Sequence, residues 1–235
     1  MLEVKRVKVR LGETEVLRDI SFHVETGERI GLIGPNGHGK TTAMKTISGI
    51  FKAMGGEILF EGQNILGRNP REIVELGIIH VPEGGHLFSD MTVYENLLMG
   101  AYPARAKADK KKNLELVYHI FPKLKLLSKN KSNGLSGGER RMLAVGRGLM
   151  SSPRLLMLDE PTLGVSPILV EEMGEKLHEI GQMGTSIILA DENMDLISGF
   201  AERVYFIENG QIKVEGPTDE VLENEYVKKT YLGIE

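Results

Sequence analysis

The sequence predicts an α/β fold with a mostly parallel sheet, an antiparallel β region and an inserted helical segment. Short apolar runs alternate with helix-like segments along most of the 235 residues, the pattern of a parallel sheet covered by helices. Near the C-terminus, "RVYFIENGQIKVEG" holds two β-like runs joined by Asn209-Gly210, a strong hairpin signal. Between about residues 88 and 150 the strand pattern stops and only helical patterns remain.

The predicted strands are short and mainly apolar, and several read as continuous apolar runs, as expected where both faces of a sheet are buried. They span residues 20–24, 29–33, 78–81, 155–158, 186–190 and 204–207. The N-terminal run "VKRVKVRL" alternates more weakly and is interpreted as an edge strand.

The best-marked helix begins after Ser166, which can cap it, with Pro167 at its first position. Glu171 and Glu172 are expected near the positive end of its dipole. Apolar residues then recur at helical spacing, namely Leu169, Met173, Leu177 and Ile180. We predict one domain over residues 1–235, with a core of 1–87 and 151–235 and a helical subdomain of about 88–150.

Composition excludes several classes of protein. The formal net charge is −4 and the pI is near 5.9, so no basic field recruits nucleic acid and no direct nucleic-acid contact is expected. The absence of cysteine excludes disulfides and thiolate metal sites. The N-terminus does not read as a signal peptide, and no run approaches the ~18 apolar residues of a membrane span. Any membrane association is therefore expected to be peripheral. The basic run "RAKADKKK" is favoured as a solvated surface over a contact with anionic lipid.

The stretch "GPNGHGKTT", residues 34–42, fits the phosphate-loop pattern G-x-x-x-x-G-K-[ST]. It follows an apolar strand and opens a helix, so backbone N–H groups and the helix N-terminus can hold an anion. Lys40 would reach the β- and γ-phosphates of a nucleotide, and the Thr41 hydroxyl would ligate Mg²⁺. His38 is unusual here, and its side chain is expected to point away from the phosphates. The predicted phosphate-binding residues are Gly34, Pro35, Asn36, Gly37, His38, Gly39, Lys40, Thr41 and Thr42.

Two carboxylates end the strand in "RLLMLDEP", at the edge of the sheet where ligands bind. We expect Asp159 to hold Mg²⁺, directly or through water, and Glu160 to orient or deprotonate the attacking water.

The segment "LSGGERR" has two interpretations. Ser136 and Glu139 can form a capping box, but that does not explain Gly137 and Gly138, since each helical glycine costs about 1 kcal/mol relative to alanine. A second nucleotide approaching this helix N-terminus would explain them.

Phosphate loop, serine-glycine-glycine turn and Asp-Glu pair, in this order, resemble an ABC-type ATPase subunit, and the resemblance spans essentially the whole chain. "VPEGGHLFSDMTVYENLLMGAY", "GRGLMSSPRLLMLDEPTLGVSP" and the terminal "YLGIE" are most similar to the shorter ATPase subunit of branched-chain amino-acid importers; urea and amide importers are close relatives. The resemblance implies ATP and Mg²⁺ as cofactors and a P-loop NTPase-type fold.

The same resemblance implies partners and a location. Two such subunits dimerise head to tail, and the partner here is expected to be a paralogue. ATP then lies between one phosphate loop and the other subunit's signature turn, which in this chain would be Leu135, Ser136, Gly137, Gly138 and Glu139. Permease subunits would dock near Glu83 and Met91 to Gly100. The chain would sit peripherally on the cytoplasmic face of the inner membrane.

Four positions depart from the general family pattern. Leu11 replaces the aromatic residue that stacks on adenine, and Glu83 replaces a glutamine that senses Mg²⁺ and the permease. Ser166 stands where an aspartate is usual. Glu192 replaces the switch histidine, and two interpretations stay open: a side chain turned away to a nearby cation, or a catalytic deficit. Importers of the branched-chain type often carry glutamate at the Glu83 position and often lack the switch histidine.

Four functions remain open from the sequence. An importer ATPase is the leading hypothesis. A lipid or lipopolysaccharide exporter ATPase shares the "SGGERR" motif but usually has glutamine at the Glu83 position. A soluble ABC ATPase acting on nucleic acid or ribosomes usually has two cassettes or long coiled arms, which this chain lacks. A non-hydrolysing binding module is motivated by Glu192.

Overall fold

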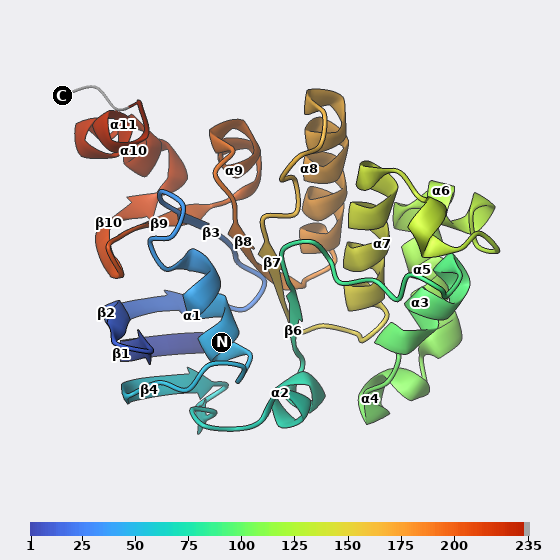
Figure 1. The fold of residues 1–235 in the computed structure, drawn as a ribbon, viewed down its shortest axis with the longest axis horizontal. Coiled ribbons are helices and arrows are strands. Elements are labelled where there is room, and N and C mark those ends of the chain that lie inside the picture. Colours follow the sequence, from blue (N-terminus) through green and yellow to red (C-terminus); the bar gives the residue numbers. More distant parts are fainter. Residues whose placement is uncertain (233–235) are drawn as a thin grey trace.

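The computed structural model describes residues 1–232 and contains two sheets with helices between and around them (Figure 1). The first sheet is antiparallel, in the order β2-β1-β4-β5. Its strands are β1 (Leu2–Leu11), β2 (Thr14–Val24), β4 (Gly55–Phe60) and β5 (Gln63–Asn64).

The second sheet has the order β10-β9-β3-β8-β7-β6, and all its pairs are parallel except β10 with β9. Its strands are β3 (Arg29–Ile33), β6 (Ile78–Val81), β7 (Leu155–Asp159), β8 (Ser186–Ala190), β9 (Arg203–Glu208) and β10 (Gln211–Pro217). The Asn209-Gly210 hairpin between β9 and β10 is present as predicted, with both turn residues at positive φ.

Residues 82 to 154 contain helices and no strand, and these helices lie together at one side of the molecule (Figure 1). They are α3 (Val93–Gly100), α4 (Ala104–Lys107), α5 (Lys110–Ile120), α6 (Pro122–Leu126), a 3₁₀ turn (Ser132–Gly134) and α7 (Gly137–Leu149). The other helices are α1 (Lys40–Ile47), α2 (Pro70–Leu76), α8 (Pro167–Gln182), α9 (Met194–Phe200), α10 (Thr218–Glu223) and α11 (Glu225–Leu232).

Two apolar cores cover the two faces of the parallel sheet. Side chains alternate between the faces along each strand, so Ile30 and Leu32 pack with α1 and the antiparallel sheet, whereas Ile33 packs on the opposite side. That second core receives the apolar sides of α7, α8 and α9. Because both faces are covered, β7 and β8 are buried at every residue.

One N-terminal strand prediction was confirmed and one was wrong. Residues 20–24 form a strand as predicted, at the end of β2 in the antiparallel sheet. The run "VKRVKVRL" lies in β1, which is not an edge strand, because it pairs with β2 on one side and β4 on the other. Its polar side chains face solvent on one face of a central strand, which weakens the apolar pattern without placing it at an edge.

The helix after Ser166 has the predicted start, but within residues 1–232 the Ser166 side chain makes no hydrogen bond that would cap it. In this part of the chain the first turn of α8 holds no acidic residue, so Glu171 and Glu172 lie beyond it. The helices of residues 1–232 include none that is long and apolar enough to cross a bilayer. In the terminal "YLGIE", the last three residues lie outside the described part of the chain.

Candidate functional site

The phosphate loop connects the end of β3 to the start of α1. Its backbone takes positive φ values of 145°, 79° and 118° at Gly34, Gly37 and Gly39. A Cβ atom on Gly34 would lie 2.0 Å from the Ile207 carbonyl oxygen, so this position accepts only glycine. The loop therefore folds tightly, so that its backbone N–H groups can form an anion-binding nest at the start of α1.

Lys40 is the cation of this loop. Its Nζ donates hydrogen bonds to the carbonyl oxygens of Gly34, at 2.5 Å, and Pro35, at 3.3 Å. The side chain is only 4% exposed. Burial lowers the pKa of the Lys40 ammonium, and nearby carboxylates, Glu192 foremost, oppose that shift. The loop thus holds a desolvated positive charge, which binds an anion more strongly than an exposed one.

A cavity of about 290 Å³ lies in front of the loop. It brings together the loop, a residue two positions after β6 and residues that follow β7. Leu163 was not predicted from the sequence, because no motif marks an apolar residue after Glu160. The cavity is lined by Asn36, Gly37, Gly39, Lys40, Thr41, Thr42, Glu83, Glu160 and Leu163.

Asp159 and Thr41 meet below this cavity. The Thr41 hydroxyl donates to Asp159 Oδ1 at 3.0 Å. The other carboxylate oxygen, Oδ2, is buried and has no hydrogen-bond partner among residues 1–232. The Thr41 hydroxyl, the buried Asp159 carboxylate and the Glu83 carboxylate in the cavity wall supply oxygen donors of the kind that Mg²⁺ prefers. These residues fit a magnesium ion that arrives with nucleotide phosphates.

Glu160 follows Asp159 with a φ of 46°, which turns its side chain from the strand into the cavity. Its backbone N–H donates to Ala190 O at 2.8 Å. Burial raises the pKa of the Glu160 carboxyl; Lys40 opposes the rise, and the negative charges of Glu83, Asp159 and Glu192 add to it. The carboxyl accepts a proton more readily than an ordinary glutamate, a property suited to a general base.

His38 connects the phosphate loop to the β9–β10 turn. Its Nδ1 accepts from the Asn209 N–H at 3.2 Å, and its carbonyl oxygen accepts from the Gly210 N–H at 3.0 Å. Gly210 O in turn accepts from the Arg18 N–H on β2 at 2.7 Å. The imidazole is therefore directed to the hairpin, and the loop is supported by both sheets.

The turn before α7 forms the capping box: the Ser136 N–H donates to Glu139 Oε2, and the Glu139 N–H donates to Ser136 Oγ. A Cβ on Gly138 would lie 2.6 Å from Leu169 Cδ1, so a larger residue here would displace the end of the Leu169 side chain. Around Gly137, by contrast, a Cβ would meet no described atom within 4 Å. Only Gly137 leaves backbone open to a ligand. Neither this turn nor Leu11, which is 39% exposed at the end of β1, lines the cavity with Lys40.

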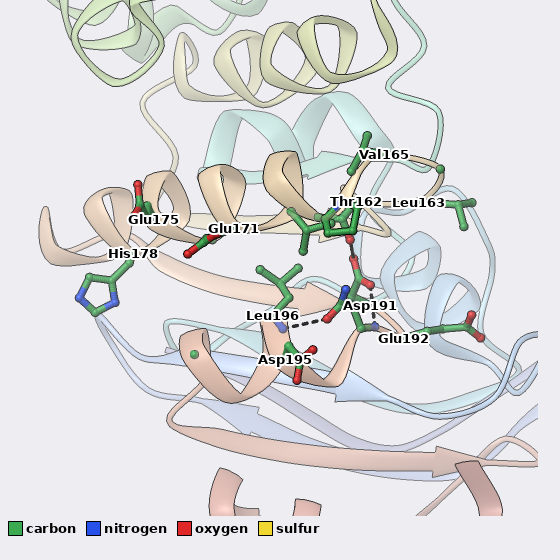
Figure 2. Close-up of a pocket in the computed structure, with 16 residues that line it drawn as sticks. Thr162, Leu163, Val165, Glu171, Glu175, His178, Asp191, Glu192, Asp195 and Leu196 are labelled. Carbon is green, nitrogen blue, oxygen red and sulfur yellow. Dashed lines mark hydrogen bonds between the residues drawn. The ribbon is translucent and has the colours of Figure 1, made fainter. Parts of the chain in front are cut away.

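Glu192 lies at one end of a larger groove of about 990 Å³ between α8 and α9 (Figure 2). Asp191 points toward Thr162, whose hydroxyl donates to it at 2.7 Å, while the Glu192 side chain lies at the end away from His178 (Figure 2). Glu192 Oε1 is 4.0 Å from Lys40 Nζ. The nearest cation to Glu192 is thus the phosphate-loop lysine itself.

The sequence has relatives of known family. Residues 17–163 match the family model "ABC transporter". The chain is 38% identical to the high-affinity branched-chain amino acid transport ATP-binding protein BraG of Pseudomonas aeruginosa, over 99% of this chain and all of that protein. It is 31% identical to the lipopolysaccharide export system ATP-binding protein LptB of Escherichia coli, over 93% of this chain and 91% of that one.

Solved structures agree. The ADP conformation of MJ1267, an ATP-binding cassette of an ABC transporter, superposes with a TM-score of 0.87 at 28% identity, covering 99% of this chain and 98% of that one. The fold class predicted from the sequence is thereby confirmed. The chain belongs to the ABC transporter family and is one of its ATP-hydrolysing subunits.

Proposed function

We propose that this chain is the energy-coupling subunit of an importer for branched-chain amino acids or a related small solute such as urea or amides. The observation that carries the proposal is the 38% identity to BraG along the whole chain, against 31% for the LptB relatives. Glu83 at the cavity wall adds support, because the resemblance associates glutamate here with importers of this type. The LptB relatives keep lipopolysaccharide export as the second candidate.

In this proposal the chain's own ATP site consists of the phosphate loop and the two carboxylates after β7. Lys40 neutralises the β- and γ-phosphates, which it reaches from its buried position beneath the loop. Thr41, Asp159 and Glu83 would hold Mg²⁺, which would supply positive charge to neutralise developing phosphate charge. Glu160 orients the attacking water and accepts its proton, as its raised pKa favours.

The signature turn serves the site of a second subunit. Ser136 and Gly137 are exposed at the start of α7, and they line no part of the cavity that holds Lys40. A head-to-tail dimer, with a paralogue as the partner, would bring this helix N-terminus to the partner's ATP. The helical segment of about 88–150 is then a subdomain that carries the signature turn.

The permease is proposed to dock beside this subdomain, at the cytoplasmic face of the membrane. Phe88, Met99 and Tyr102 are 44%, 43% and 59% exposed, and they line a cavity of about 340 Å³. Arg147 on α7 donates to Gly85 O at 2.6 Å and His86 O at 2.9 Å. These bonds connect the loop after Glu83 to α7, the helix that begins at the signature turn. A shift of the docked permease would therefore move both Glu83 and the signature turn.

The transport role is tested by purifying the tagged chain from membranes and identifying its permease. Reconstituted vesicles are then supplied with solute-loaded binding protein or with lipopolysaccharide. Solute-dependent stimulation of ATP hydrolysis with uptake supports the importer. Stimulation by lipopolysaccharide alone would establish the exporter instead, and ribosome or nucleic-acid copurification without a permease would contradict both.

Base selectivity should be weak in this protein. Leu11 offers no aromatic ring for adenine, and a stacking contact contributes about 1 kcal/mol, or roughly fivefold in affinity. We expect ATP and GTP to bind with similar affinity, and Leu11→Tyr to strengthen ATP binding by about that factor. Fluorescence titrations with both nucleotides measure this. A strong ATP preference in the unmodified protein would show that another residue contacts the base.

Glu192 should slow hydrolysis at this chain's own site. Its carboxylate, 4.0 Å from Lys40 Nζ, competes with the γ-phosphate, and one missing preorganised donor typically costs about 10²–10³ in rate. In a complex whose partner site is disabled, Glu192→His should raise turnover by about tenfold or more. Glu192→Gln is the matched control, because it removes the charge without adding an imidazole. An unchanged or lower rate in Glu192→His would show that hydrolysis here needs no switch histidine.

A further inference from the structure

His80 lies beside the proposed magnesium ligand Asp159. It sits on β6 in register with Met157 of β7, so its side chain reaches the carboxyl end of the neighbouring strand. The His80 side chain is 5% exposed and that of Asp159 is fully buried. His80 Nε2 is 3.8 Å from Asp159 Oδ2, and His80 Nδ1 is 3.3 Å from Ser48 Oγ.

The two atoms that face each other, His80 Nε2 and Asp159 Oδ2, both lack a hydrogen-bond partner among residues 1–232, and both are buried. A buried polar group without a partner costs about 1–3 kcal/mol. The distance of 3.8 Å between these two atoms is longer than a hydrogen bond, but a small rotation of either side chain would close it. A histidine that only filled the core would have its nitrogens satisfied elsewhere.

The Asp159 carboxylate favours a proton on His80 Nε2, because the opposite tautomer would place two lone pairs against each other. The Ser48 hydroxyl lies within reach of three acceptors, at 2.9 Å from Met44 O, 3.2 Å from Lys45 O and 3.3 Å from His80 Nδ1. Both carbonyl oxygens also accept a backbone N–H, so the hydroxyl can turn to Nδ1 without leaving either of them unpaired. A neutral imidazole that accepts at Nδ1 carries its proton on Nε2, which faces the Asp159 carboxylate.

We propose that His80 is a positioning residue that holds Asp159 Oδ2 through its Nε2–H, so that the carboxylate is fixed for magnesium. Thr41 orients Oδ1 from one side and His80 orients Oδ2 from the other. This inference rests on the proposed magnesium role of Asp159. Removing a side chain that hydrogen-bonds to a metal ligand typically lowers metal affinity by about 10- to 100-fold.

The experiment measures metal binding and not turnover. For the full-length chain, ADP affinity is determined by calorimetry with Mg²⁺ and with EDTA, and the ratio of the two gives the metal-dependent gain. The electron paramagnetic resonance spectrum of Mn²⁺ bound with ADP reports the ligand geometry. His80→Leu should lower the gain by about tenfold or more and change the Mn²⁺ spectrum, while ADP affinity in EDTA stays the same.

Matched variants separate positioning from packing. His80→Gln keeps an N–H donor on a side chain of similar reach and should retain most of the gain, and Ser48→Ala should lose part of it. Equal losses in His80→Leu and His80→Gln, or a wild-type gain in His80→Leu, would overturn the inference. Asp159→Asn is the reference: a wild-type gain there would overturn the magnesium role of Asp159 itself.

Discussion

Replacing Glu160 with glutamine is expected to lower ATP turnover by about 10²–10⁴-fold, the usual contribution of a general base. Glutamine keeps the size of the side chain in the cavity but accepts no proton. ATP binding should persist, because Lys40 and the phosphate loop are unchanged, so the variant should accumulate an ATP-bound dimer with its partner subunit. Phosphate release measures the first effect and analytical ultracentrifugation the second.

Glu171→Gln is the control for this experiment. It removes the same charge from an exposed position on α8 and should leave turnover unchanged. The isolated wild-type chain is expected to be mainly monomeric. Full turnover in Glu160→Gln would contradict the assignment of Glu160 as the base, and a stable homodimer that forms without nucleotide would contradict the predicted mode of assembly.

Lys40→Ala should abolish tight MgATP binding. The ammonium is buried beneath the loop, and losing one partner of a buried charged contact costs about 2–5 kcal/mol, equivalent to roughly 30-fold or more in affinity. The carboxylates of Glu160, Asp159 and Glu192, which act on Lys40 in the wild type, would then repel the phosphates without opposition. Isothermal titration calorimetry with MgATP measures the loss.

Lys45→Ala is the matched control on the same helix. Its ammonium lies 5.5 Å from the centre of the Phe51 ring, and Lys45 does not line the cavity in front of the loop. MgATP affinity should therefore stay at the wild-type value. Undiminished binding in Lys40→Ala would show that another cation holds the phosphates.

Local motifs predicted the parts of the site that depend on neighbouring residues. The motifs "GPNGHGKTT" and "RLLMLDEP" each lie within one turn or at one strand end, so they can be recognised without knowing the fold. The parallel sheet that contains β3 and β7 then brings Lys40 and Asp159 together. The position of β1 could not be read this way. It depends on pairing between residues as distant as Leu2 and Phe60, and alternation alone does not reveal how many neighbours a strand has.

Two features of the site depend on contacts between segments distant in the sequence. Gly138 packs against the end of the Leu169 side chain, a contact between helices that no motif encodes. His80 stands in the apolar run "IIHV", and a polar residue in a buried strand was the available signal. Its relation to Asp159 follows from the register of β6 with β7, which the sequence leaves open.

Because the β9–β10 turn supports the phosphate loop, the loop is expected to take its final shape late in translation. The loop is translated early, at residues 34–41, but β3 is flanked in the sheet by β8 and β9, and His38 is bound by Asn209 and Gly210. A nascent chain therefore carries the nucleotide motif long before it carries the strands that shape it. Pairing at such separation is slow to form, and the growing chain can bind ATP tightly only after residue 210 has been added.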